Sequence, residues 1–178
     1  MKFNKKNFFL YLNKNFLFEK NPLIAVAVSG GPDSMALIYL MKEWIRSKKG
    51  KIIALLVDHK LRVESYNECK KTKNYLKTLN VNSKIIRVNS KKINKKNMHE
   101  ARQNRYDKLI SFCKSQNILH LFLGHHFDDN LETFLIRKVA GSNFEGLASM
   151  PFSIIRNKVQ IIRPLINYKK YQIMSPGI

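Results

Sequence analysis

Alternating strand and helix patterns constrain the fold of this chain more than any other feature. Apolar runs rich in β-branched residues recur at 23–28 (LIAVAV), 52–57 (IIALLV), 85–88, 118–123 and 159–162. The segments between them, such as 35–45 and 106–113, carry apolar residues at helical spacing. Strands that are apolar throughout are typical of a parallel sheet covered on both faces. We therefore predict an α/β fold, doubly wound, with a mostly parallel five-stranded sheet and helices on both faces.

The length of 178 residues suits one domain, which we place over 1–178, with an N-terminal helix within 1–20. No stretch approaches the roughly 18 apolar residues of a membrane span, and the N-terminus lacks a cleavage site, so we expect no membrane association. Cys69 and Cys113 lie far apart without a CxxC pair, which disfavours a disulfide framework or an iron–sulfur site. We expect a cytoplasmic protein.

The charge balance is strongly basic. The 33 Lys and Arg residues against 12 Asp and Glu give a formal net charge of +21, which favours a polyanionic partner such as RNA. Lys outnumbers Arg 25 to 8, so compositional drift is an alternative source of the charge. The acidic residues are not scattered in the same way, because five of the twelve lie at or just after predicted strand ends: Asp33, Asp58, Asp128, Asp129 and Glu132.

The sequence SGGPDS follows the first predicted strand directly and precedes a helical pattern. Two glycines allow a sharp turn, and proline is tolerated at the first position of a helix. Backbone N–H groups at such a helix start bind phosphate oxygens, and the two serine hydroxyls add donors. The pattern is neither GxxxxGK[ST] nor GxGxxG. We predict a nucleotide phosphate site formed by Ser29, Gly30, Gly31, Pro32, Asp33 and Ser34, where Mg²⁺ relieves the repulsion between Asp33 and phosphate.

The sequence LGHHFDDNLET at 123–133 follows the fourth predicted strand. Gly124 allows close approach, and Asp128 and Glu132 lie one helical turn apart. We expect the next apolar residues to face inward: Leu131, Phe134, Leu135 and Val139. Two alternatives remain for the polar residues, namely a helix cap by Asp128 or Asp129 and, less favoured, a zinc site.

These motifs resemble those of known families. SGGPDS resembles the SGGxDS PP-loop of the N-type ATP pyrophosphatases, and LGHHFDDNLET is similar to the LGHHxDDxxET signature of the tRNA(Ile)-lysidine synthase family. Further matches to that family follow its order: VDHKLR (57–62), EARQNRY (100–106), GLASM (146–150) and RPL (163–165). The sequence is identified as a member of this family over about 23–165, and 166–178 would begin a further C-terminal region.

The resemblance implies a C–N bond-forming ligase. ATP would adenylate the C2 carbonyl oxygen of the wobble cytidine in tRNA(Ile) with a CAU anticodon, and L-lysine would displace AMP to give lysidine. It implies catalytic roles for Asp33, Arg102, Arg105, His126 and Asp129. It implies that Asp58 and Gly124 join the phosphate turn in binding ATP, that Asp33 and Asp129 hold Mg²⁺, and that Asp128, Asp129 and Glu132 bind lysine.

Several alternatives stay open from the residues alone. His125 could replace His126 in proton transfer, and either could be a purely structural histidine. Asp58 could cap a helix, and Arg102 and Arg105 could be surface cations. Another PP-loop enzyme, such as a thiolase, is a rival, although thiolases of the 2-thiocytidine type carry CxxC pairs. An inactive, RNA-binding remnant is a second rival, and a homodimer is left open.

Overall fold

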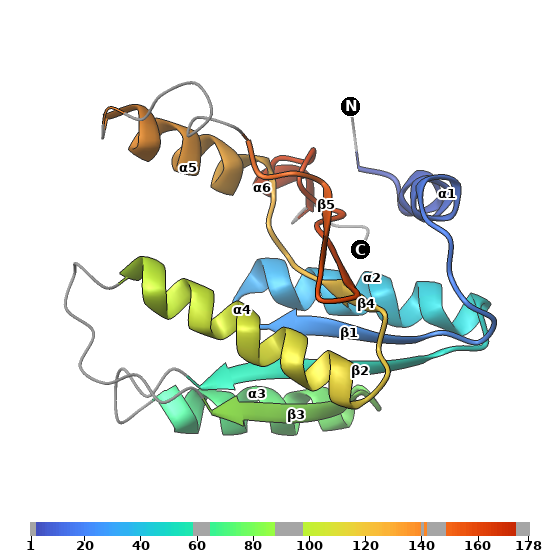
Figure 1. Cartoon of the computed structure of the whole chain (residues 1–178). Helices are drawn as coiled ribbons and strands as arrows, with labels where there is room; N and C mark the ends of the chain where they lie inside the picture. The colour runs from blue at the N-terminus through green and yellow to red at the C-terminus, as the bar shows by residue number, and fades with distance from the viewer. Residues whose placement is uncertain (1–2, 59–64, 88–97, 140, 142–148, 174–178) are drawn as a thin grey trace.

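The computed structural model describes residues 3–58, 65–87, 98–139, 141 and 149–173. The helices are α1 (Lys5–Asn15), α2 (Pro32–Ser47), α3 (Ser65–Thr78), α4 (Met98–Ser115), α5 (Phe127–Val139) and α6 (Lys170–Ile173). The strands are β1 (Leu23–Val28), β2 (Lys51–Asp58), β3 (Asn82–Arg87), β4 (His120–Phe122), β5 (Ser153–Arg156) and β6 (Val159–Ile162). Figure 1 shows their arrangement.

The strands form one sheet in the order β3-β2-β1-β4-β6-β5. Every neighbouring pair is parallel except β5 with β6, which is antiparallel. The order reverses between β1 and β4, so a crevice is expected at the carboxyl ends of these two strands. The predicted doubly wound, mostly parallel sheet is confirmed, and its point of reversal lies beside the glycine-rich turn that follows β1.

The sheet has six strands, one more than the sequence predicted. The additional strand, β5, forms a hairpin with β6 through Asn157 and Lys158, whose φ angles are 49° and 68°. It has only four residues, and Ile155 is 71% exposed at the sheet edge. Such a short, half-exposed edge strand carries no continuous apolar run, so the pattern that identified the buried strands missed it.

Helices cover both faces of the sheet, as predicted. Successive residues of β1 point to opposite faces, as strand geometry requires. Ile24 and Val26 pack in a cluster with residues of α1, α2 and α3, whereas Ala25 packs with residues of α4. Figure 1 shows α4 on one face and α2 and α3 on the other.

The N-terminal helix occupies Lys5–Asn15, a shorter stretch than the predicted range of 1–20. Asn4 caps it, because its side-chain oxygen accepts hydrogen bonds from the backbone N–H groups of Lys6 at 2.9 Å and Asn7 at 3.2 Å. Phe8 and Leu12 lie one helical turn apart and are fully buried in the core. No helix among the described residues is long and apolar enough to cross a membrane.

The prediction that the apolar side chains of α5 face inward is wrong. The helix has no buried residue, and Leu131, Leu135 and Val139 are 46%, 50% and 89% exposed. Figure 1 shows α5 extending away from the sheet. The helical period was correct, but periodicity identifies an apolar face without specifying what covers it. Within the described part of the chain, nothing does.

Candidate functional site at the carboxyl ends of β1 and β4

The turn after β1 is held closed by its two serines. The backbone N–H of Ser29 donates to Ser34 Oγ at 3.2 Å, and that hydroxyl donates to the Gly31 carbonyl at 2.9 Å. Gly30 has a φ of +86°, in the left-handed region that glycine adopts without strain. Pro32 is the first residue of α2. The sequence prediction of a strand, a tight turn and a helix start is therefore confirmed.

Gly124 brings the loop after β4 directly against this turn. A Cβ atom at Gly124 would lie 3.2 Å from Ser34 Cα and 3.3 Å from Ser34 N. Both contacts are with backbone atoms, which cannot rotate away. Two motifs that are almost a hundred residues apart in sequence thus meet at the reversal point of the sheet, and glycine is needed for the contact.

Three aspartates surround the buried side chain of His126. Its Nε2 lies 3.6 Å from Oδ2 of both Asp33 and Asp129, and its Nδ1 lies 3.4 Å from Asp128 Oδ2. The same Asp129 oxygen accepts a hydrogen bond from the His126 backbone N–H at 2.9 Å. This bond resembles the reciprocal half of a capping box at the start of α5, which supports the cap alternative for Asp129.

One cavity of about 330 Å³ joins these elements. Its polar lining includes Ser29, Asp33, Ser34, Ser65, Glu68, Arg105, Tyr106, Gly124, His125 and Asp129, and its apolar lining comes from β1, β2, α4 and the end of β4. Size, polarity and position suit a nucleotide with its phosphates toward the turn. A concave site at the strand ends is where doubly wound folds bind ligands.

A family model described as a PP-loop domain matches residues 3–176. The chain belongs to the PP-loop domain family. It is similar to the tRNA(Ile)-lysidine synthase of Orientia tsutsugamushi (strain Boryong), with 41% identity over 160 residues that cover 88% of this chain and 35% of the relative. It is equally similar to the tRNA(Ile)-lysidine synthase of Wolbachia pipientis wMel, with 41% identity over 155 residues that cover 86% of this chain and 36% of the relative.

The chain therefore spans about a third of the length of the curated relatives it matches. Among solved structures, the U34-tRNA thiolase NcsA from Methanococcus maripaludis, described with its [4Fe-4S] cluster, has a TM-score of 0.78 at 18% identity. The match covers 95% of this chain and 60% of that one. At this identity the likeness shows the shared fold.

Not every predicted site residue of this PP-loop domain lines the cavity. Asp58 is buried, and its Oδ1 accepts a hydrogen bond from the hydroxyl of Ser65, the first residue of α3, at 2.8 Å. Glu132 is exposed on α5, and Asp128 Oδ2 accepts a hydrogen bond from the Lys170 backbone N–H at 2.7 Å. Residues 59–62 and 146–148 of two matched motifs lie outside the described residues, as do the side chains of Glu100 and Ala101.

The resemblance implied catalytic roles for both Arg102 and Arg105, which lie three residues apart on α4. The structure places them in different surroundings. Arg105 lines the nucleotide cavity, whereas Arg102 lines a neighbouring cavity, where its Nη2 donates to Met150 Sδ at 3.6 Å. Tyr106 lines both cavities.

The positive charge of nearby arginines shifts the pKa values of His125 and Tyr106. Burial, together with the positive charges of Arg163, Arg102 and Arg105, lowers the pKa of His125 to about 3, so its imidazole is neutral. Burial by itself raises the pKa of Tyr106, but the charge and hydrogen bond of Arg163 outweigh it and the net shift is downward. Both shifts report the positive charge of Arg102, Arg105 and Arg163, and that charge favours an anionic occupant.

Sequence reasoning missed Lys170. Its Nζ lies 3.4 Å from Asp33 Oδ2, so an ammonium group of the chain itself lies at the edge of the aspartate cluster. The other oxygen, Asp33 Oδ1, is buried without a hydrogen-bond partner among the described residues. Nothing in the local sequence of Lys170 indicates this contact, which depends on α6 packing beside α2.

Proposed function

We propose that this PP-loop domain is the ATP-dependent catalytic domain of a tRNA(Ile)-lysidine synthase. It would join L-lysine to C2 of the wobble cytidine of cytoplasmic tRNA(Ile) with a CAU anticodon, giving lysidine, AMP and pyrophosphate. The observation that carries the proposal is the meeting of the phosphate turn with the His126 aspartate cluster across Gly124. The names of the relatives and the net charge of +21 support it.

In the first step the C2 carbonyl oxygen of cytidine bonds to the α-phosphorus of ATP, and the bond to the bridging oxygen breaks so that pyrophosphate leaves. The turn residues 29–34 orient the β- and γ-phosphates through backbone N–H groups and the hydroxyls of Ser29 and Ser34. Arg105, in the same cavity, neutralises charge on the α-phosphate.

The acidic residues fit a magnesium ion that is shared with substrate phosphates. Mg²⁺ usually takes one or two protein carboxylates and completes its shell with phosphates and water. Asp33 Oδ1 is buried without a partner among the described residues, and Asp33 and Asp129 flank the same imidazole nitrogen. The described residues contain no set of three metal-ligating side chains that could hold an ion alone. A bound Mg²⁺ would stabilise the charge of the leaving pyrophosphate.

In the second step the lysine amine bonds to C2, the C2–O bond breaks, and AMP leaves. The incoming ammonium must first lose a proton, and His126 would accept it; the three aspartates within 3.6 Å of its imidazole support this role. Asp128 and Asp129 would attract the cationic substrate, with Glu132 at the rim. Lys170 illustrates the complementarity, because its own ammonium group lies 3.4 Å from Asp33.

The test is lysine-dependent release of AMP from ATP by the purified chain with Mg²⁺ and transcribed tRNA(Ile). Asp33→Ala should abolish this release and leave tRNA binding nearly unchanged. Glu43→Ala is the matched control, because it removes an exposed carboxylate from the same helix, where Glu43 pairs with Lys5. If the wild-type chain bound tRNA but released no AMP, an RNA-binding protein without catalysis would replace the proposal.

A further inference from the structure

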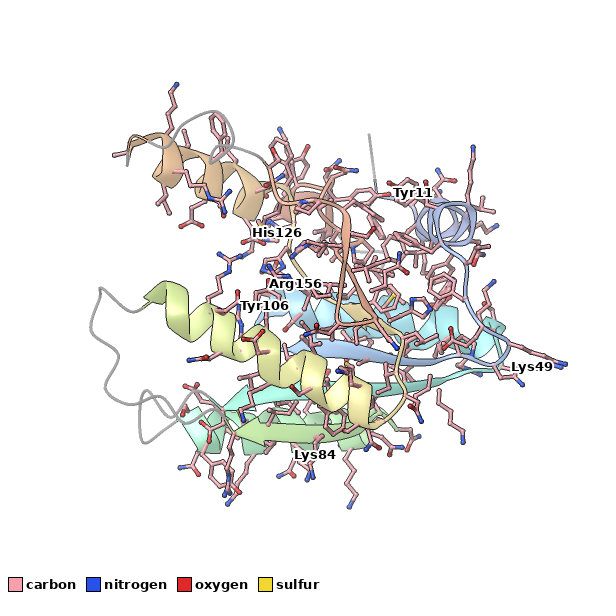
Figure 2. The ribbon with its side chains drawn as sticks, viewed as in Figure 1. Tyr11, Lys49, Lys84, Tyr106, His126 and Arg156 are labelled. Atoms are coloured by element: carbon pink, nitrogen blue, oxygen red, sulfur yellow. The ribbon has the colours of Figure 1, made fainter. Side chains whose placement is uncertain are left out.

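A second cavity, of about 350 Å³, lies beside the nucleotide cavity and is lined by four arginines from four segments of the chain. These are Arg102 on α4, Arg137 on α5, Arg156 at the end of β5 and Arg163 just after β6. Among the described residues, no aspartate or glutamate lines it. Figure 2 shows the side chains of Arg156 and Tyr106 between α4 and the β5 hairpin. We call it the four-arginine pocket.

Arg163 gives the pocket a buried, incompletely bonded cation. Its side chain is 7% exposed, its Nη1 donates to the Pro151 carbonyl at 2.9 Å, and its Nε has no hydrogen-bond partner among the described residues. Within the described part of the chain, no ion pair involves Arg102, Arg156 or Arg163. Guanidinium groups that converge without a carboxylate repel one another, and an oxyanion relieves this repulsion through forked hydrogen bonds.

We propose that the four-arginine pocket binds a backbone phosphate of single-stranded RNA, next to the nucleotide that enters the ATP cavity. The inference deepens the proposed function, on which it rests. Tyr106 lines both cavities, so a phosphate in one pocket is adjacent to the site of chemistry in the other. Pro151 and Ile154 add an apolar wall that suits the sugar or base beside the phosphate better than a free inorganic anion.

This assignment separates the roles of two arginines on one helix. Arg105 faces the ATP cavity and acts on the nucleotide phosphates, whereas Arg102 faces the four-arginine pocket and acts on the RNA. Phosphate contacts of this kind set the register of an RNA without reading its sequence. The pocket would thus hold the strand so that one base reaches the adenylation site.

The experiment measures binding of a fluorescein-labelled RNA stem-loop with a CAU loop to the full chain, by anisotropy over a salt series. Arg156→Ala should raise Kd about five- to tenfold and reduce the salt slope by about one unit, while ATP binding is unchanged. Lys84→Ala is the matched control, because it removes one exposed cation from β3, at the opposite end of the sheet. Arg163→Lys, which keeps the charge but loses the fork, should weaken RNA binding while the circular dichroism spectrum stays native.

Equal RNA affinity for Arg156→Ala and Lys84→Ala would overturn the inference. Competition by inorganic pyrophosphate distinguishes a free-anion site, because weaker pyrophosphate binding by Arg156→Ala with unchanged RNA binding would also overturn it. The two proposals fail separately. If the wild-type chain released no AMP, the difference in RNA affinity between Arg156→Ala and Lys84→Ala could still be measured. If that difference were absent, the wild-type chain could still release AMP.

Discussion

Replacing Gly30 by alanine tests how the phosphate turn is built. Gly30 has a φ of +86°, and an added Cβ would lie 2.7 Å from Thr72 Oγ1 of α3. An L-residue in the left-handed region costs about 1–2 kcal/mol. The Thr72 hydroxyl cannot move freely, because it donates to the Glu68 carbonyl at 3.0 Å, and losing that bond costs about 1 kcal/mol. We therefore expect Gly30→Ala to lower the free energy of unfolding by about 2–3 kcal/mol.

Gly141 provides the matched control for the backbone contribution. Its φ is +73°, and no atom of the described residues lies within 4 Å of a Cβ added there. Gly141→Ala should therefore show only the left-handed cost of about 1–2 kcal/mol. The difference between the two variants, about 1 kcal/mol, measures the clash with Thr72. Urea unfolding followed by circular dichroism gives both values, provided that the m-value is unchanged.

Thr72→Ala isolates the same clash from the other side. It removes the oxygen that an alanine at position 30 would meet, so the double variant should be more stable than additivity predicts by about 1 kcal/mol. ATP binding should be weak in Gly30→Ala and in the double variant, because an alanine at position 30 favours leaving the left-handed region, which would turn the N–H groups away from phosphate. Additivity within about 0.5 kcal/mol would refute the steric reasoning. Full ATP binding by Gly30→Ala would refute the role of the turn.

Three further predictions concern charge in the cavity. The pKa of His125 is about 3, against 6.5 for a free histidine, so between these values only the unfolded chain takes up the proton. The free energy of unfolding should therefore decrease as the pH is lowered below 6.5, by up to about 1.4 kcal/mol per pH unit. His125→Gln should remove this pH dependence, which urea unfolding at about pH 6 and about pH 5 measures. Lys170→Met should tighten Mg²⁺ binding several-fold in calorimetry, because the ammonium no longer competes for Asp33; weaker binding would contradict it. Arg105→Ala should raise the KM for ATP about tenfold or more and leave the Kd for RNA unchanged, and the reverse pattern would exchange the two cavities.

The sequence predicted well those features that depend on local signals. The bounds of β1 and β6 were correct to the residue, because each is an apolar run bounded by polar or turn residues. The tight turn between β1 and α2 was also predicted correctly, since glycine and proline have strong backbone preferences. The position of LGHHFDDNLET beside that turn followed from parallel topology, in which the carboxyl ends of the strands share one edge.

The features it missed depend on contacts between distant segments. Lys170 reaches Asp33 across more than a hundred residues of sequence, and no local pattern encodes that approach. Arg102 and Arg105 lie only three residues apart on α4, yet they line different cavities, and Tyr106 lines both. The same holds for α5. Its helical periodicity was predicted correctly, but the sequence did not show whether another segment of the chain packs on its apolar side chains.

Charge acts in this domain on two length scales. The net charge of +21 attracts a polyanion over about a Debye length, roughly 8 Å at physiological salt, and drift toward lysine would produce such a field anywhere on the surface. Drift does not explain three aspartates within 3.6 Å of one buried histidine, or four arginines around one cavity with no acid among its described lining residues. At these distances local groups outweigh the overall field. The net positive charge of the surface would thus attract RNA to the domain, and the four-arginine pocket would position the RNA backbone. The aspartates around His126 would bind Mg²⁺ and the ammonium group of lysine.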